Sequence, residues 1–429
     1  MPVAMTVQNK TTQEIPSGYK KADVGVIPED WEVRSVNQIA NPVRGGSPRP
    51  AGDSRFFDGS YIPWLTVAAL TNIPASQLIV SETETYLTEE GSLRSRTLTP
   101  GILIIANSGA TLGIAKILGI KCCANDGIAA LLNLSKNVSP NYLAQFINTK
   151  TNYLREVVAT GNGQPNLNTG LIGDFKIPLP PTKEEQEAIA DALSDVDALI
   201  DSLQILIAKK NDLKQAAMQQ LLAGQSRLPG FDGVWDMKVL GNIAQVMKGQ
   251  GLSRGKLSQS GNFFCIHYGD LFTTYKEEII EVYNKTDFRE GIVSNSGDVL
   301  LPGSTTTSGI DLAKASALLV GDVLLGGDIN IIRQTDDTYS PTFLAYCLTH
   351  IYKSEIVQRT KGITIHHLQG KDLHDLAIKM PKIDEQTAIA KVLSDMASEI
   401  VAFEQRLAKT RDLKQGMMQE LLTGRIRLV

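Results

Sequence analysis

The chain has 429 residues, 42% of them hydrophobic and 21% charged, with a formal net charge of −4 at pH 7. This length is enough for two or three domains, each with its own core. No apolar run approaches the roughly 18 residues of a membrane helix. The first residues also lack the basic and apolar parts of a signal peptide, so we expect a cytoplasmic protein. The acidic balance disfavours a generic nucleic-acid-binding protein, so any such binding has to be local.

Residues 1–18 are expected to form a flexible arm, followed by a first globular domain over residues 19–181. From Val24 the sequence consists of short apolar runs, such as GILIIANS, separated by glycine, serine, asparagine and proline. This rhythm is typical of short strands and turns with a few helices. An amphipathic helix is predicted from Asn141, and the segment IPLPP then ends the domain. The four cysteines have no disulfide or metal-binding spacing, and we expect buried thiols.

A long helix is predicted over residues 182–227. Thr182 precedes Glu185 by three residues, a spacing typical of a capping box. Apolar residues then recur at alternating steps of four and three from Ile189 to Ile207, which is a heptad pattern. Gly224 is the type of residue that commonly follows a helix end. At 1.5 Å per residue this helix would be about 60 Å long, too long to be buried within one domain.

The second half of the chain repeats the first. EEQEAIADALSD matches DEQTAIAKVLSD, and NDLKQAAMQQLLAGQSRL matches RDLKQGMMQELLTGRIRL, in one register without a gap. The match predicts a second domain over residues 228–381 and a second long helix over residues 382–429. The domains themselves agree only in short islands, such as those around Trp31 and Trp235. The two helices are therefore expected to have the same function, whereas the two domains are expected to have different functions.

A lone helix with an apolar seam needs a partner, and the other copy is the obvious one. We therefore predict an α+β fold with an internal pseudo-twofold repeat. Two mixed α/β globular domains are separated by two long, antiparallel, coiled-coil-like helices. Short connections at the helix ends would make the arrangement nearly circular.

The sequence contains no recognisable catalytic, cofactor-binding or metal site. GLSRGK has one residue too few between its glycines for a phosphate loop and lacks the following Ser or Thr. No (N/D)PP(Y/F) tetrapeptide of a methyltransferase is present. The adjacent His366 and His367 have no carboxylate or cysteine at a ligand spacing. The sequence therefore offers no residue for a catalytic role, although the absence of a motif does not exclude an enzyme.

Both domains carry a glycine-rich basic loop shortly after the matched tryptophan, VRGGSPRP in the first and MKGQGLSRGK in the second. Glycine allows backbone amides to approach phosphates, and arginine can read guanine edges bidentately. Two further pairs of segments are weaker candidates for DNA contact: NSGATLG with GSTTTSG, and GNGQPN with KGITIHH. For all of these loops the alternative is an ordinary solvated turn. The predicted DNA-binding residues are Arg44, Arg49, Lys248, Arg254, Lys256, Asn107, Ser108, Thr111, Thr305, Thr306, Asn162, Gln164, Lys361 and His366.

The end of each long helix repeats polar residues as well as apolar ones. A seam between two helices explains identical apolar positions, but it does not explain identical polar positions that face outward. A surface shown twice to the same kind of partner explains them, and gene conversion is the alternative. The predicted partner-binding residues are Asp212, Lys214, Gln215, Met218, Gln219, Leu222, Asp412, Lys414, Gln415, Met418, Gln419 and Leu422.

From Tyr19 onward the chain has a globular domain, a proline-containing linker and a long helix, and then the same order again. In this order it resembles the DNA-specificity subunit of type I restriction-modification systems. The segments that carry the resemblance are VGVIPEDWEV, IPLPPTKEEQEAIA with MPKIDEQTAIA, and the two LLxGxxRL endings. The resemblance implies two domains that each read one half of a bipartite DNA site, and helices that set the spacing and dock two methyltransferase subunits. It implies S-adenosylmethionine, ATP and Mg²⁺ only on partner subunits, including two ATP-dependent restriction subunits where present. The alternative is a protein-binding scaffold with two divergent recognition heads.

Overall fold

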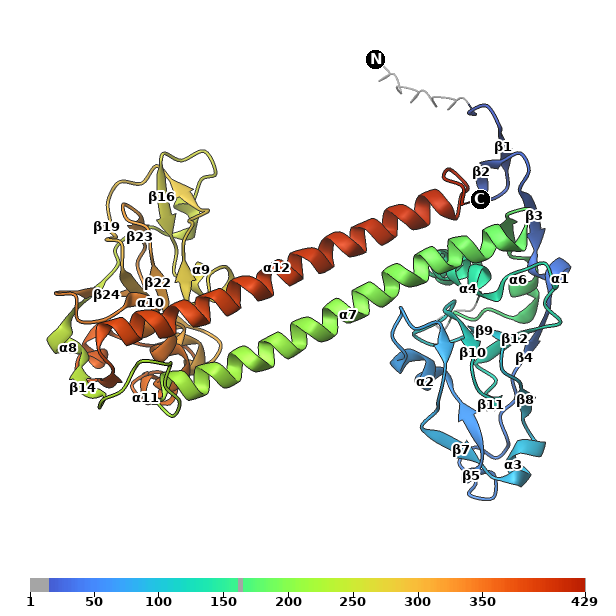
Figure 1. Cartoon of the computed structure of the whole chain (residues 1–429), viewed down its shortest axis with the longest axis horizontal. Helices are drawn as coiled ribbons and strands as arrows, with labels where there is room; N and C mark the ends of the chain where they lie inside the picture. Colours follow the sequence, from blue (N-terminus) through green and yellow to red (C-terminus); the bar gives the residue numbers. More distant parts are fainter. Residues whose placement is uncertain (1–14, 161–164, 429) are drawn as a thin grey trace, which may run out of the picture. The chain divides into compact units, whose positions relative to one another are not determined.

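The computed structural model describes residues 15–160 and 165–428, so most of the predicted arm lies outside the described residues. The chain divides into two units, one containing residues 1–204 and 405–429 and the other residues 205–404. Each unit contains one globular head, the start of one long helix and the end of the other. Each helix therefore begins in one unit and ends in the other (Figure 1).

The first head is built on a five-stranded sheet of order β4-β12-β9-β10-β6 and a four-stranded sheet of order β7-β5-β11-β8. Small antiparallel pairs, β1 with β2 and β3 with β13, flank them. Its strands are β1 (Tyr19–Ala22), β2 (Gly25–Pro28), β3 (Glu32–Ser35), β4 (Asn41–Arg44), β5 (Phe57–Leu65), β6 (Ile79–Val80), β7 (Thr85–Leu87), β8 (Arg96–Leu98), β9 (Leu103–Ala106), β10 (Ala115–Leu118), β11 (Cys122–Ala124), β12 (Ile128–Leu132) and β13 (Lys176–Leu179). Its helices are α1 (Val36–Ile39), α2 (Val67–Asn72), α3 (Glu89–Leu93), α4 (Pro140–Thr149), α5 (Thr151–Tyr153), a π-helical turn (Leu154–Val158) and α6 (Thr169–Asp174).

The central strands of the first head are apolar throughout because both faces of the five-stranded sheet are covered. Leu103 and Ile105 of β9 face a core that contains α4, whereas Ile104 and Ala106 face a second core formed with the four-stranded sheet. Successive strand residues point to opposite faces, so a doubly covered strand reads as an unbroken apolar run. This accounts for the sequence LIIA, in which all four residues are buried.

The second head has the same topology, with sheets of order β15-β24-β20-β22-β17 and β18-β16-β23-β19. Its strands are β14 (Asp236–Val239), β15 (Ala244–Lys248), β16 (Phe263–Ile266), β17 (Glu278–Ile279), β18 (Lys285–Thr286), β19 (Ile292–Val293), β20 (Asp298–Pro302), β21 (Ser304–Thr305), β22 (Ser316–Leu318), β23 (Leu324–Leu325), β24 (Ile329–Gln334), β25 (His366–His367) and β26 (Ala377–Met380). Its helices are α8 (Leu240–Ile243), α9 (Asp270–Thr273), α10 (Pro341–Tyr346) and α11 (Lys353–Gln358), with short 3-10 or π turns at Arg254–Lys256, Gly309–Ala313, Cys347–Ile351 and Gly370–Leu373. Heads with little common sequence thus share one fold, and the predicted α+β repeat is confirmed.

The long helices are α7 (Lys183–Leu222) and α12 (Ile383–Leu421). In the first unit, Leu421 and Leu422 join Ile189 and Leu193 in one core, and further along Lys414 contacts Asp197. Positions that ascend on α7 therefore meet positions that descend on α12, which is the predicted antiparallel arrangement. In the described part of the chain, no helix has the length and apolar character needed to cross a membrane.

The predicted capping box at the start of α7 is only half correct. The Thr182 hydroxyl accepts a hydrogen bond from the Glu185 backbone N–H at 3.2 Å, as predicted. The Glu185 carboxylate does not return to the helix start; instead it receives the guanidinium of Arg427, whose Nη2 lies 2.8 Å from Oε2. Asp30 holds the other side of the same guanidinium, with both distances at 3.0 Å. Hydrogen bonds to Glu185 and Asp30 raise the pKa of Arg427 above its usual value.

The second unit repeats this contact with Arg227 and Glu385, at 2.5 and 2.6 Å. Both glutamates are buried, with side chains 1% and 3% exposed. The glycine of each LLxG ending has a positive φ, +72° at Gly424 and +68° at Gly224, and packs on the matched tryptophan, Trp31 or Trp235. We call each set, Arg427, Glu185, Gly424 and Trp31 in the first unit and Arg227, Glu385, Gly224 and Trp235 in the second, a helix clasp.

The glutamine that follows each clasp glutamate joins the helix to its own head. The Oε1 atoms of Gln186 and Gln386 accept hydrogen bonds from the backbone N–H groups of Ser139 and Ser340, at 2.9 and 3.0 Å. Ser139 and Ser340 are the N-cap residues of α4 and α10. The repeated Glu-Gln pair is therefore explained by contacts within each unit.

The first prediction concerns the buried clasp carboxylate. Arg427→Met leaves Glu185 buried without its main partner, and loss of one member of such a pair typically costs about 3 kcal/mol or more. We expect the free energy of unfolding of the first unit to fall by that amount in chemical denaturation. The control is Arg425→Met, since Arg425 pairs with Glu420 while 60% exposed; it should change stability by less than about 0.5 kcal/mol. Equal effects of the two substitutions would contradict a structural role for the clasp.

The second prediction compares the two clasp glycines. Alanine in the left-handed region costs about 1–2 kcal/mol at either position. At Gly424 the added Cβ would also lie 2.5 Å from Cγ of Pro28, whereas at Gly224 its nearest neighbour is Trp235 at 3.3 Å. Thermal denaturation should therefore show Gly424→Ala as the more damaging variant. Gly416→Ala, within α12 with no atom within 4 Å of its added Cβ, should be neutral or stabilising.

Candidate nucleic-acid interface

In the first head, three predicted positions converge on Asp126, in the turn between β11 and β12. Arg44 Nε donates to the Asp126 carbonyl oxygen at 2.5 Å, and Arg49 Nη2 lies 3.4 Å from its carboxylate. Asn107 Nδ2 donates to the same carbonyl at 3.3 Å. Both arginines are more than half exposed, whereas Asn107 is buried at 1%. The basic loop and the NSGATLG segment therefore share one anchor, and its arginines are the accessible groups.

The glycines of the basic loops have a structural role that the sequence did not reveal. A Cβ on Gly45 would lie 2.1 Å from the carbonyl oxygen of Asn125, and one on Gly249 would lie 2.0 Å from that of Gly326. Each loop thus runs directly against the backbone of the turn that supplies its aspartate. The glycines permit this close approach, which fixes the position of the neighbouring basic side chains.

The second head arranges equivalent segments around Asp328. Lys248 Nζ lies 2.9 Å from its Oδ1, and Ser304 Oγ donates to its Oδ2 at 3.3 Å. Ser304 belongs to β21, which pairs with β25 so that Thr305 lies opposite His366. All three segments predicted to bind DNA in this head are therefore neighbours.

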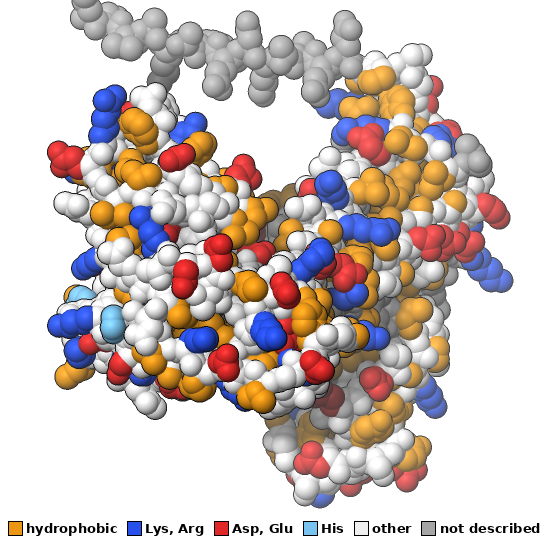
Figure 2. All heavy atoms as spheres, turned by 60° about the vertical axis from the view of Figure 1, so that its left-hand side comes forward, with side chains coloured by type: hydrophobic (Ala, Val, Ile, Leu, Met, Phe, Trp, Pro, Cys, Tyr) orange, Lys and Arg blue, Asp and Glu red, His pale blue; other side chains and the backbone are white. Residues whose placement is uncertain are grey.

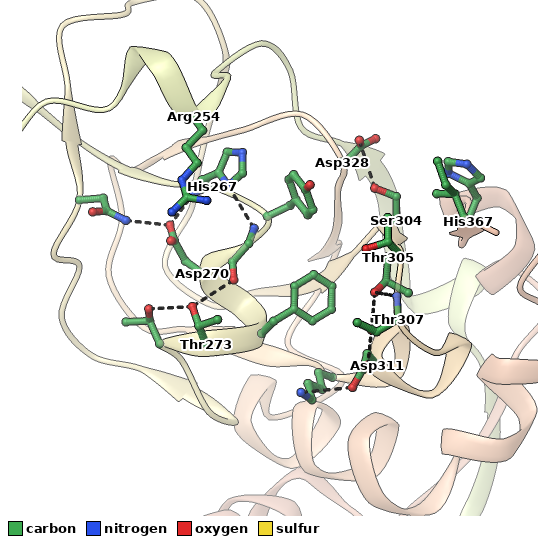
Figure 3. A pocket seen from close by; sticks show the side chains of 18 of the residues that line it. Arg254, His267, Asp270, Thr273, Ser304, Thr305, Thr307, Asp311, Asp328 and His367 are labelled. Carbon is green, nitrogen blue, oxygen red and sulfur yellow. Dashed lines mark hydrogen bonds and ion pairs between the residues drawn. The ribbon is translucent and has the colours of Figure 1, made fainter. Parts of the chain in front are cut away.

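These segments border a cleft of about 990 Å³ in the second head (Figure 3). One wall comes from the loop after β15 and the segment around α9, and the other from β21, the turn after it and β25. Figure 3 shows Arg254 and His267 close together on the first wall, with Ser304, Thr305 and Thr307 on the second. The lining residues are Arg254, Leu257, His267, Tyr268, Gly269, Asp270, Phe272, Thr273, Thr274, Asn284, Ser304, Thr305, Thr306, Thr307, Asp311, Lys314, Asp328, Ile365 and His367.

The three carboxylates of the cleft are all engaged by the protein itself. Asp270 accepts from the His267 backbone N–H and from Asn284, both at 2.9 Å. Asp311 accepts from Thr307 at 2.6 Å and pairs with Lys314 at 3.3 Å. Asp328 is held as described above. Figure 2 shows acidic and basic side chains interspersed over the visible surface rather than gathered into one basic patch.

The predicted DNA-binding residues fall into different environments. Arg254, Thr305 and Thr306 line the cleft, whereas Lys248 only pairs with a lining aspartate. Lys256 lies 3.4 Å from the ring centroid of Phe288, and Lys361 pairs with Asp372 at 2.8 Å. His366 is absent from the lining, which its neighbour His367 joins instead. In the first head Ser108 is half-buried and Thr111 is buried beside Thr71, while Asn162 and Gln164 lie outside the described residues.

Sequence reasoning missed His267, Lys314 and His367 as cleft residues. His267 lies in FFCIHYGDL, a segment that matches IPWLTVAAL of the first head, where Thr66 stands at the same position. The replacement of threonine by histidine within a matched segment was the one sequence signal that pointed to His267. No metal site is indicated, since the described residues contain no group of three or more His, Cys, Asp or Glu side chains placed to hold an ion.

The helix ends show the same exposure pattern in both copies. Asp212, Gln215 and Gln219 are exposed, as are Asp412, Gln415 and Gln419, while Met218 and Met418 are half-buried. Next to them Leu213 is 49% exposed and Leu413 is 58% exposed. This outward face is the repeated surface, defined by residues 212, 213, 215 and 219 and their counterparts 412, 413, 415 and 419.

Four of the residues predicted to bind a partner make contacts within the chain. Leu222 and Leu422 are buried in the cores of the two heads. Lys414 donates to Asp197 at 2.6 Å, and Lys214 lies 5.5 Å from the ring centroid of Tyr346. The lysines differ in partner because Ala397 stands at the position equivalent to Asp197. Lys414 thus contacts the other long helix, whereas Lys214 lies near α10 of the second head.

Comparison with known proteins gives one consistent result. Residues 28–214 and 233–410 each match the family described as the type I restriction modification DNA specificity domain. The type I restriction enzyme MjaIX specificity subunit of Methanocaldococcus jannaschii is 23% identical over 96% of this chain and 96% of its own length. The S subunit of the type I restriction-modification system from M. genitalium has a similar fold, with a TM-score of 0.59, 13% identity and coverage of 91% of this chain and 96% of its own. A structure reported for complex assembly and conformational transition of the type I R-M system has a TM-score of 0.54 and 17% identity. The match covers 93% of this chain and 99% of that chain.

The chain belongs to the family of type I restriction-modification DNA specificity proteins, with one copy of the specificity domain in each half. It is a specificity subunit with two DNA-recognition domains, and the catalytic sites of such systems lie on other subunits. The chain is therefore a recognition protein rather than an enzyme, and as such it has no cofactor of its own. The alternative of a protein-binding scaffold is set aside by this membership.

Proposed function

We propose that each head reads one half of a bipartite DNA site through the loops described above. In the first head the contacts come from Arg44 and Arg49, which Asp126 holds in place. In the second head they come from the cleft that contains Arg254, Thr305 and Thr306. The observation that carries the proposal is that both heads bring the same segments together around an aspartate, although their sequences differ. A common framework with different side chains suits the recognition of two different sequences.

The two long helices set the distance between the half-sites in this proposal. Each helix is anchored at its start in one head and at its end in the other by the clasps, so neither end can slide relative to its head. The repeated surface docks two methyltransferase subunits, one at each helix end. Partner subunits supply S-adenosylmethionine binding and, where restriction subunits join, ATP and Mg²⁺. We place the assembly in the cytoplasm.

The third prediction tests the division of labour between the heads. The chain, assembled with its methyltransferase subunit, is used to select from a library of randomised DNA duplexes. We expect two short specified blocks separated by an unspecified spacer. Exchanging residues 228–381 for the second head of a different specificity subunit should change one block and leave the other intact. No duplex preference at any salt concentration would contradict DNA recognition, and a change in both blocks would contradict independent heads.

The fourth prediction tests docking on the repeated surface. Leu213→Asp and Leu413→Asp each place a charge at the apolar centre of one copy, so native mass spectrometry should find one methyltransferase subunit bound instead of two. The double variant should bind none. The control is Ile205→Asp, because Ile205 is 70% exposed on the same helix but has Gln405 as its counterpart. Retention of two subunits by the double variant would contradict docking at this surface.

A further inference from the structure

Among the described residues, none forms a hydrogen bond or ion pair with the side chain of Arg254. It stands in a short 3-10 turn on the wall of the cleft, and its side chain is exposed. Nearby cations differ in this respect, since Lys248 pairs with Asp328 and Lys314 pairs with Asp311. Arg254 therefore presents its N–H groups to whatever occupies the cleft.

His267 stands beside Arg254 with its orientation fixed. Its Nδ1 accepts a hydrogen bond from the Gly269 backbone N–H at 3.2 Å, and its ring packs on Tyr268 with centroids 4.5 Å apart. Burial lowers the pKa of His267; nearby Asp270 opposes this and Arg254 adds to it, and the net shift favours the neutral ring. A neutral ring that accepts at Nδ1 carries its proton on Nε2. Figure 3 shows this ring next to the Arg254 guanidinium.

The charge of the cleft favours a base edge over the phosphate backbone. Three aspartates line it, against Arg254 and Lys314 as the cationic side chains. A site with more carboxylates than cations repels phosphate, and phosphate binding normally requires an excess of positive charge. Because the carboxylates already accept hydrogen bonds from the protein, the uncommitted groups are mainly donors. Their natural partner is a base with two adjacent acceptors.

We propose that Arg254 and His267 together read one guanine in the half-site of the second head, by donating to its N7 and O6 atoms. Guanine is the base that presents two neighbouring acceptors in the major groove. The first head has Thr66 at the position of His267, so this donor pair is specific to the second head. The inference rests on the proposed reading of DNA by this cleft.

The test uses the complex with its methyltransferase subunit and the randomised duplex library. Arg254→Ala should reduce the preference for guanine at one position of one block by roughly 5- to 150-fold, the usual value of a bidentate base contact. His267→Ala should weaken the preference at the same position, whereas His267→Gln, which keeps a donor, should retain part of it. The remaining positions of the same block should keep their preference, which shows that the second head is folded, and the other block should be unchanged.

Two controls separate a base contact from a phosphate contact. Replacing that guanine by 7-deazaguanine removes the N7 acceptor; it should weaken binding of the unmodified protein and have little further effect on Arg254→Ala. Arg289→Ala removes another exposed cation of the second head, one that lies over Phe263 and does not line the cleft, and it should not change the selected sequence. The inference is overturned if Arg254→Ala weakens all duplexes equally, as loss of a phosphate contact would, or if 7-deazaguanine has no effect. If the unmodified protein selects no bipartite site at all, the proposed function fails instead.

Discussion

A buried carboxylate in each unit depends on a guanidinium from a distant part of the chain. Glu185 and Glu385 lie at the starts of the two long helices and are almost fully buried. A carboxylate in that environment is strongly destabilising unless it is paired. The partners, Arg427 and Arg227, follow the end of the other helix, 242 and 158 residues away in sequence. Neither head is therefore a closed unit without a segment from the other half of the chain, and the antiparallel arrangement follows from this pairing.

The helices and the repeat could be predicted from the sequence because their signals are local. The heptad spacing, the threonine N-cap and the helix-terminating glycines each depend on residues within a few turns of one another. The sheets could be predicted only as a rhythm of short strands. Their order depends on long-range pairing, such as the parallel alignment of β11 with β5, which no short segment encodes.

The candidate site shows the same limit. The basic loops could be found because they recur after matched tryptophans, but the aspartates that hold them lie about 80 residues further on, in turns with no distinctive sequence. The identical polar residues at the helix ends were a partial guide. Lys414 pairs with Asp197 of the other long helix and Lys214 lies near Tyr346 of the second head, while the glutamines beside them face outward. Identical residues in the two repeats can therefore have different contacts within the molecule.

The clasps also impose an order on folding during synthesis. The first head is made first, but its unit includes residues 405–429, which the ribosome produces after the second head is finished. The second unit spans the continuous stretch 205–404 and can close as soon as that stretch has emerged. The head translated second is therefore the first that can complete its core, and the nascent first head keeps an unpaired Glu185 until Arg427 arrives.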